Sequence, residues 1–523
     1  MIVPPKVHGA RQGLPQLLPG LYLSAVALFS GAAVMVIELA GTRILAPWFG
    51  NSLYTWTGLI GVILVSMGCG YYVGGMIADK WPQYVVLAHL IAGAGIFTLA
   101  IPFLYPVLER NIGMMHFISG PVVASLLLFA IPGCLLAAVS PFAVKLMSLL
   151  TCNRKIGLSS GNVSMCAALG SVIGTFGAGF WLIPNLQLRM LFLIIGLMLG
   201  LFALAGYGLF AEPRQRRAGL VTGVFLIFGG VVAALLFWQT SEAAGTLYDH
   251  TSCYQRIRVI ENQTRTGDTR RLILLDLTTE GGQYVNSREL PIRYQKFWEL
   301  TKVFCPGLKS ALFLGGGGFG MPEALHDAFP QAAIDVIELD PMVIEVGRRF
   351  FRTEQYPRMQ VSAGDARKYL RHHNRQYDFI FGDVFNGVHT IPAHLVTIEF
   401  FQEIKRHLTD RGLYMMNIIS AVEGEKSTLF HAVANTMRQV FDHMEVFTLS
   451  PGSPAQLQTL LVLTAKKEIP INSLKITSSL SPATQETFLN SYLRPDQYAA
   501  STQVVLTDEF NPVEYMVASA RRE

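Results

Sequence analysis

Residues 311–320 read ALFLGGGGFG, and residues 334–340 read IDVIELD. The first stretch is a short apolar run that ends in glycines, and the second is an apolar run that ends in acids. A strand, a Gly-rich turn, a helix and an acid-tipped strand form a dinucleotide-type βαβ unit, in which the glycines admit the ligand and the acid binds ribose hydroxyls. We therefore predict a Rossmann-like α/β domain that binds an adenosine-containing cofactor through Gly315, Gly316, Gly317, Glu338 and Asp340.

Two more apolar runs with acidic ends follow along the chain. Residues 361–366 (VSAGDA) fit a third strand whose terminal Asp365 can accept from the exocyclic amine of adenine. Residues 377–383 (YDFIFGD) fit a fourth strand that ends in Asp383. In open α/β sheets the ligand lies beyond the carboxyl ends of the strands. Asp383 is therefore expected to face the reacting end of the cofactor.

The segment before the Gly-rich turn predicts a small antiparallel sheet, because residues 254–260 (YQRIRVI) and 271–275 (RLILL) alternate and are rich in β-forming residues. Taken together, residues 250–465 resemble spermidine synthase, the aminopropyltransferase branch of the class I methyltransferase fold. The whole chain resembles the membrane-fused members of that group. The resemblance rests on Tyr254, Gln255, Ile257, Val259, Asp276, Gln283, Glu338, Gly364, Asp365 and Asp383.

The resemblance implies a role for each of these positions. Asp383 matches the catalytic aspartate, the base that takes a proton from the attacking amine. The cofactor would be S-adenosylmethionine or its decarboxylated form, bound by Gly315, Gly316, Gly317, Gln283, Glu338, Asp340, Gly364, Asp365 and Ala366. The substrate would be bound by Tyr254, Gln255, Tyr294 and Asn386.

Two positions depart from the family pattern. Spermidine synthases carry an aspartate in the Gly-rich loop that holds the amino group of the donor, and here that position is Gly318. The catalytic aspartate is normally followed three residues later by a second acid, and here that residue is Asn386. A polyamine ammonium without carboxylate partners is poorly held. We therefore expect a non-standard donor or acceptor.

The N-terminal half has a different composition. The chain has 523 residues, of which 51% are hydrophobic and 15% charged, whereas soluble domains carry about 25% charged residues. Residues 1–245 contain 12 Lys and Arg but only 5 Asp and Glu. The shortage of charge is therefore concentrated in this half. The net basic balance belongs to predicted membrane loops and is no argument for nucleic-acid binding.

This half predicts a seven-helix transmembrane domain, because a membrane span needs roughly 20 apolar residues. Within it, Glu38 and Arg43 are functional candidates, since an ionisable group in a span is costly; a structural Glu38–Arg43 pair at the membrane interface is the alternative. The predicted spans cover about 19–40, 54–77, 84–106, 119–149, 158–184, 189–210 and 217–238.

The side of the membrane is contradictory in the sequence. If the N-terminus is inside, the inside segments hold nine Lys and Arg and the outside loops three, a clear positive-inside bias. With seven spans, this bias places the C-terminal half outside the cell. S-adenosylmethionine, however, is a cytosolic metabolite. On that chemistry we expect a multi-pass protein of the cell (inner) membrane with its soluble domain in the cytoplasm.

The six cysteines are scattered, with no CxxC pair and no Cys/His cluster, so no metal site is expected. Cys253 and Cys305 could form a disulfide only if the soluble half were extracytoplasmic. The expected partners are the lipid bilayer and a small amine or membrane-borne substrate. Self-association into a homodimer is left open.

We thus expect residues 1–245 to form the membrane domain, 246–305 a small antiparallel β subdomain, and 306–523 the Rossmann-like cofactor-binding domain. Three functions are compatible with the sequence. The first is aminopropyl-type transfer that releases methylthioadenosine, with Asp383 as general base. The second is methyl transfer to a membrane-borne substrate. The third is a non-enzymatic cofactor sensor joined to a transporter-like membrane half.

Overall fold

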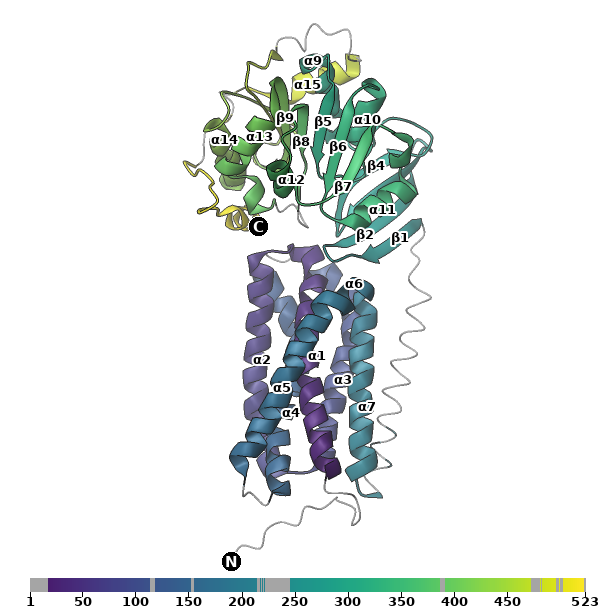
Figure 1. Cartoon of the computed structure of the whole chain (residues 1–523), viewed down its shortest axis with the longest axis vertical. Helices are drawn as coiled ribbons and strands as arrows, with labels where there is room; N and C mark the ends of the chain where they lie inside the picture. The colour runs from purple at the N-terminus through teal and green to yellow at the C-terminus, as the bar shows by residue number, and fades with distance from the viewer. Residues whose placement is uncertain are drawn as a thin grey trace, which may run out of the picture. The chain divides into compact units, whose positions relative to one another are not determined.

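The computed structural model describes residues 17–112, 118–151, 155–213, 217, 219, 221, 245–385, 391–471, 480, 482–494, 498 and 502–521. The chain divides into two compact units, residues 1–243 and 244–523. The first unit is helical in its described part and the second is built on β-sheets (Figure 1).

Six helices in the described part of the first unit are long and apolar enough to cross a membrane. They agree with the first six predicted spans, whereas the seventh, 217–238, lies almost entirely outside the described residues. The fifth span is continuous from Ile156 to Asn185 but contains a π-helical turn. The elements are α1 (Leu17–Phe49), α2 (Leu53–Lys80), α3 (Tyr84–Ile112), α4 (Ser119–Leu150), α5 (Ile156–Gly177), η1 (Ala178–Leu182), α6 (Ile183–Asn185) and α7 (Leu188–Phe210).

Glycines allow α1 and α5 to pack closely, as the small-residue spacing indicates. A Cβ on Gly170 would lie 1.8 Å from the carbonyl oxygen of Leu28, and one on Gly174 would lie 2.5 Å from that of Ala32. No side chain fits at either position. Glu38 and Arg43 both lie half-buried on α1, and their functional role stays a prediction.

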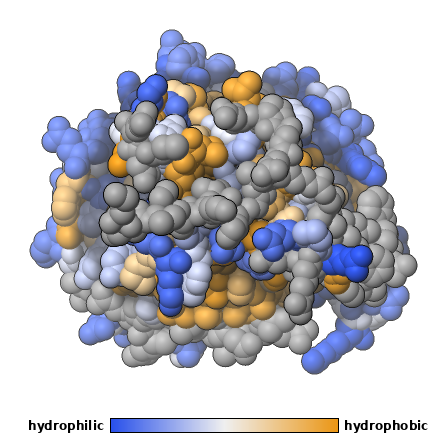
Figure 2. Space-filling model, turned by 90° about the horizontal axis from the view of Figure 1, so that it is seen from below, coloured by the Kyte–Doolittle hydropathy of each residue, from blue (hydrophilic) through white to orange (hydrophobic). Residues whose placement is uncertain are grey.

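Large apolar side chains remain exposed on this unit. On α2 they include Val65 and Tyr72, and on α5 Ile173 and Phe176, which are between 58% and 71% exposed. Figure 2 also shows hydrophobic surface, in orange, between the grey atoms of its view. Exposed apolar surface of this extent is typical of regions that contact a membrane or another protein.

The second unit contains two sheets. The smaller is the predicted antiparallel sheet, extended to four strands in the order β1-β2-β3-β4. The larger has eight strands in the order β12-β10-β11-β9-β8-β5-β6-β7. The strands are β1 (Thr246–Thr251), β2 (Arg256–Gln263), β3 (Thr269–Leu275), β4 (Thr278–Tyr284), β5 (Ser310–Leu314), β6 (Ala333–Glu338), β7 (Met359–Ala363), β8 (Tyr377–Gly382), β9 (Leu408–Ser420), β10 (His443–Thr448), β11 (Gln458–Ala465) and β12 (Tyr492–Leu493).

The larger sheet has a topological switch point between β5 and β8. The chain runs outward from β5 through β6 to β7, and then returns to pair β8 with the other side of β5. These strands and β9 are parallel, whereas β11 and β10 are antiparallel to their neighbours. The predicted Rossmann-like arrangement is thereby confirmed. Ligands of such sheets bind beyond the carboxyl ends of the strands at the switch point.

Alternate residues of the central strand pack on opposite faces, because side chains of a strand alternate in direction. Phe313 of β5 joins a core with helices α10 and α11 and the small sheet, whereas Leu312 joins a core with α12, α13, α14 and α16. Both faces are therefore covered (Figure 1). The remaining helices are η2 (Tyr294–Glu299), α9 (Leu300–Phe304), α10 (Gly320–Ala328), α11 (Pro341–Phe350), η3 (Thr353–Gln355), α12 (Ala366–His372), η4 (Ala393–Leu395), α13 (Ile398–His407), η5 (Glu425–Ser427), α14 (Thr428–Arg438), α15 (Pro482–Ser491) and α16 (Val513–Ala520).

Candidate active site

A pocket opens at the carboxyl ends of β5, β6, β7 and β8. Gly315, Gly316 and Gly317 line it, as expected. Gly315 has φ +99° and Gly317 φ +49°, a left-handed region that favours glycine. A Cβ on Gly315 would lie 2.2 Å from the carbonyl oxygen of Asp383. The glycine therefore lets the ends of the two switch-point strands meet.

Glu338 ends β6 and is buried at the wall of the pocket. Its Oε2 accepts from the N–H of Gly316 at 2.8 Å, and its Oε1 accepts from the N–H of Asp340 at 3.0 Å. Burial raises the pKa of this carboxyl, while the backbone donors, that of Asp340 first, lower it. The two backbone donors thus fix the carboxylate at the wall of the pocket.

Asp365 also lines the pocket, together with Gly364 and Ala366. One carboxylate oxygen caps α12 by accepting from the N–H of Lys368 at 2.7 Å. The other lies 3.2 Å from Nε2 of His394. Asp365 therefore has both a capping role and access to the pocket, as the adenine assignment requires.

Asp383 follows β8 at the switch point and lines the pocket. The hydroxyl of Tyr294 donates to its Oδ2 at 2.7 Å, and the amide of Asn417 donates to its Oδ1 at 2.8 Å. Burial raises the pKa of the Asp383 carboxyl, and these two donors lower it. The result is an oriented carboxylate with an elevated pKa, a combination suited to general-base chemistry.

A second carboxylate of this part of the pocket was not predicted from the sequence. Glu280 of β4 lines the pocket, and burial followed by the nearby charge of Asp383 raises its pKa to about 7. Gln295, in the 3-10 helix η2, lines the pocket as well. The only signal for Glu280 in the sequence is an acid in an otherwise neutral stretch, TTEGGQ, and that stretch has no strand pattern.

Comparisons with known proteins identify relatives of the C-terminal unit. Residues 296–473 match the model of the spermine/spermidine synthase domain. Polyamine aminopropyltransferase of Vibrio vulnificus is 29% identical over 280 residues, which are 51% of this chain and 89% of that protein. The chain is a spermidine synthase-like protein. Its relatives named polyamine aminopropyltransferases are transferases. Its C-terminal unit has the Rossmann-like class I methyltransferase fold.

The spermidine synthase-like match also extends beyond the C-terminal unit. Polyamine aminopropyltransferase 2 of Aquifex aeolicus is 25% identical over 403 residues, which are 74% of this chain and 77% of that protein. This length exceeds that of residues 244–523, so the match reaches into the helical unit. A crystal structure of a probable spermidine synthase from Corynebacterium glutamicum covers 51% of this chain and 97% of its own, with 22% identity and a TM-score of 0.42.

The remaining predicted residues of this spermidine synthase-like site are divided between the pocket and other places. Gln255 lines the pocket, and Tyr294 contacts Asp383. Asn417 contacts Asp383 too. Asn386 lies outside the described residues.

Three predicted residues are not among those that line the pocket. The amide of Gln283 donates to Oε2 of Glu323 on α10, whereas Glu280, which lies at the irregularity of the β3–β4 register, lines the pocket. Asp340 caps α11 and accepts from the hydroxyl of Ser252. The Tyr254 side chain is 42% exposed.

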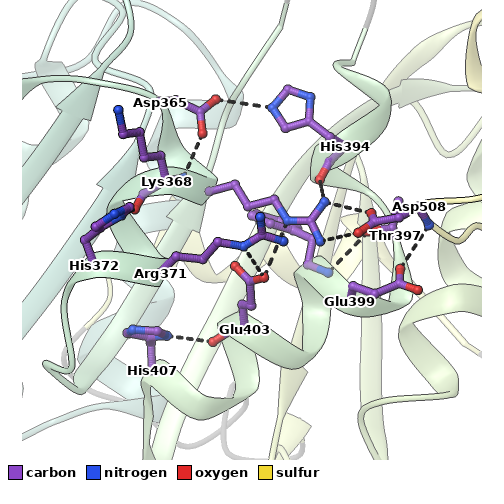
Figure 3. A network of polar contacts seen from close by, with 12 residues as sticks. Asp365, Lys368, Arg371, His372, His394, Thr397, Glu399, Glu403, His407 and Asp508 are labelled. Atoms are coloured by element: carbon purple, nitrogen blue, oxygen red, sulfur yellow. Dashed lines mark hydrogen bonds and ion pairs between the residues drawn. The ribbon is translucent and has the colours of Figure 1, made fainter.

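A C-terminal segment holds one wall of the pocket. Pro392, His394 and Leu395 line the pocket. Arg367 of α12 donates to the backbone oxygen of His394 at 3.1 Å and forms a two-armed ion pair with Asp508. Figure 3 shows this network, in which His394 reaches Asp365 on one side and Asp508 lies beside Thr397 on the other.

Cysteines and possible metal ligands were considered as further parts of the site. Cys253 and Cys305 are both free thiols. Within the described ranges, no group of three or more His, Cys, Asp or Glu side chains is arranged to hold a metal ion.

Proposed function

We propose that this protein transfers a three-carbon aminopropyl group from decarboxylated S-adenosylmethionine to an amine and releases methylthioadenosine. The observation that carries the proposal is Asp383, a half-buried carboxylate at the switch point that Tyr294 and Asn417 orient toward the pocket. The names of the relatives, polyamine aminopropyltransferases, support the same chemistry.

The reaction needs positioning and one proton acceptor. The amine nitrogen attacks the methylene carbon next to the sulfonium, and a C–N bond forms as the C–S bond breaks. The electron pair of the C–S bond stays on sulfur, which becomes the neutral thioether of methylthioadenosine. The proton leaving the amine passes to the Asp383 carboxylate. Orientation of donor and acceptor supplies much of the rate enhancement in such displacements.

The residues on the wall of the pocket would hold the nucleoside. Glu338 would accept from the ribose hydroxyls and Asp365 from the exocyclic amine of adenine. The Gly315–Gly317 backbone would let the nucleoside lie close to the strand ends. Among the described residues that line the pocket none is Lys or Arg, so the carboxylate of S-adenosylmethionine would find no cationic partner there. This favours the decarboxylated donor.

We further propose that the protein is integral to the cell (inner) membrane and that its soluble domain works in the cytoplasm. Six long apolar helices support insertion, and exposed apolar side chains on α2 and α5 would contact lipid acyl chains. The cytosolic origin of the donor supports the side. The acceptor amine would then be soluble or would arrive from the bilayer.

Product analysis tests the reaction. Full-length protein in detergent is incubated with a panel of amines and either S-adenosylmethionine or its decarboxylated form. The nucleoside product is then identified by mass. Methylthioadenosine that disappears in Asp383→Asn supports the proposal. S-adenosylhomocysteine as the product would reassign the protein to methyl transfer. Binding of the donor without any nucleoside product would contradict catalysis and favour a cofactor sensor.

A further inference from the structure

Strand β4 packs directly on the Gly-rich loop. A Cβ on Gly318 would lie 2.6 Å from the backbone nitrogen of Gly282, and one on Gly281 would lie 2.3 Å from that of Gly318. Backbone therefore meets backbone at this point. Position 318 has no room for a side chain, so the loop cannot present a carboxylate of its own there.

The residue next to this contact is an acid. Glu280 precedes Gly281 on β4, and a Cβ on Gly317 would lie 3.0 Å from the Glu280 carbonyl oxygen. The hydroxyl of Tyr294, which donates to Asp383, also lies 3.3 Å from that carbonyl oxygen. The backbone carbonyl of Glu280 therefore lies next to both the Gly-rich loop and the hydroxyl of Tyr294, which donates to Asp383.

The charges around Glu280 are of one sign. Its pKa is raised first by burial and then by Asp383, with Asp276 and Glu338 adding further negative charge. The hydroxyl of Thr278 is the neighbouring donor. Of the described residues that line the pocket, the only basic one is His394, which contacts Asp365. Buried carboxylates are paired or change protonation, and a cationic ligand would supply the pairing.

A buried orphan acceptor lies at the same place. Gln295 is 4% exposed and lines the pocket, and its Oε1 has no hydrogen-bond partner among the described residues. A Cβ on Gly281 would lie 3.5 Å from Nε2 of Gln295, which places this amide beside the β4–loop contact. Buried polar atoms normally have partners. An acceptor and a carboxylate at one site call for a ligand with several N–H donors.

We propose that Glu280, assisted by Oε1 of Gln295, binds the primary ammonium at the end of the three-carbon chain of the donor. The carboxylate comes from β4 because the backbone contact at Gly318 closes the loop position to side chains. This inference rests on the proposed function for the identity of the ligand. It also accounts for how a site with glycine in the loop retains an amine-bearing donor.

Binding measurements with matched ligands test the proposal. Calorimetry on the full-length protein in detergent compares decarboxylated S-adenosylmethionine, the amine-bearing donor, with the dimethylsulfonium analogue of methylthioadenosine, which keeps the sulfonium charge but has no aminopropyl chain. Glu280→Gln should weaken binding of the first ligand about 10- to 100-fold, the range expected for losing a charged hydrogen-bond partner, and leave the second within twofold. Glu280→Asp should restore part of the difference.

Controls separate this from a general loss of the site. Glu338→Gln should weaken both ligands equally, and the exposed Glu289→Gln should change neither. Equal weakening of both ligands in Glu280→Gln, or no weakening of the amine-bearing one, would refute the proposal. If instead the wild-type protein binds the amine-bearing ligand selectively through Glu280 but yields no nucleoside product, the transferase function fails and the ammonium site stands.

Discussion

Arg367 and Asp508 form a two-armed ion pair between residues 141 positions apart, with Nη1–Oδ1 and Nη2–Oδ2 both at 2.7 Å. The hydroxyl of Thr397 donates to the same carboxylate at 2.8 Å. The amide of Asn511 donates to the backbone oxygen of Ala393 at 2.7 Å. The C-terminal segment thereby holds η4, whose residues His394 and Leu395 line the pocket.

We expect Asp508→Asn to loosen this wall. It removes a charged partner of a nearly buried guanidinium, but Asp508 is itself 39% exposed, so solvent screening limits the loss to about 1–3 kcal/mol of unfolding free energy. Binding of adenosine ligands should weaken as well, since His394 and Leu395 lose their support. Thermal unfolding and calorimetry check both effects. Arg371→Met is the matched control: this exposed residue pairs with Glu403, and its loss should cost less than about 1 kcal/mol.

The same pair predicts an acid sensitivity. The hydrogen bond from Arg367 is the first cause that lowers the pKa of Asp508. A carboxyl with a depressed folded pKa contributes stability above its unfolded pKa, and that contribution is lost as the pH falls through the folded value. Between neutral pH and pH 3–4 (roughly the titration range of an aspartate), the wild-type protein should therefore lose more unfolding free energy than the Asp508→Asn variant. An unchanged pH profile of unfolding would contradict the role of this pair.

Glu338 and Asp340 are two residues apart yet should behave differently. Glu338→Gln should weaken every adenosine ligand about tenfold or more, because a charged acceptor of the ribose is lost. Asp340→Asn should leave ligand affinity nearly unchanged and lower stability by less than about 1 kcal/mol, because asparagine is also a good N-cap. Calorimetry and thermal unfolding on both variants separate binding from capping. Loss of binding in Asp340→Asn alone would reverse the assignment.

The contrast between these two acids shows how far the sequence predicts the site. The acidic ends of β6, β7 and β8 could be placed because an apolar run followed by an acid is a local pattern. The exact end of β6 could not be predicted from a local pattern. The strand ends at Glu338, and Asp340 is therefore the N-cap of helix α11. The strand β4 has no local pattern either, and Glu280 could not be found.

Tertiary contacts explain the other discrepancies in the site. Gln283 resembles a family position, but its amide contacts Glu323 on α10, whereas Glu280 of the same strand lines the pocket. Asn417 reaches Asp383 from β9, which pairs with β8 only in the folded sheet. For the helical unit, apolar length predicted seven spans, of which six correspond to helices and the seventh lies almost entirely outside the described residues. Their membrane insertion stays a proposal.

Asp383→Asn should lower the rate of transfer by roughly 100- to 10,000-fold, the usual contribution of a general base, with donor affinity changed by less than about threefold. Burial raises the pKa of Asp383, and a base acts in its ionised form. The rate of the wild-type protein should therefore rise with pH through that pKa and then level off. Single-turnover rates across a pH series measure this. Tyr294→Phe, which removes one of two donors to the carboxylate, should raise the pKa and shift the rising limb to higher pH.

Titration of Glu280 should make binding of the amine-bearing donor depend on pH, whereas titration of Asp383 should change the rate of transfer. With its pKa raised to about 7, Glu280 is largely neutral at pH 6 and ionised at pH 8, while an alkyl ammonium stays charged because its pKa lies near 10. The preference for the amine-bearing donor over the dimethylsulfonium analogue should therefore grow from pH 6 to pH 8 in the wild-type protein. In Glu280→Gln the preference should stay flat across the same range. A preference that is independent of pH in the wild-type protein, or that still grows in the variant, would show that another group binds the ammonium.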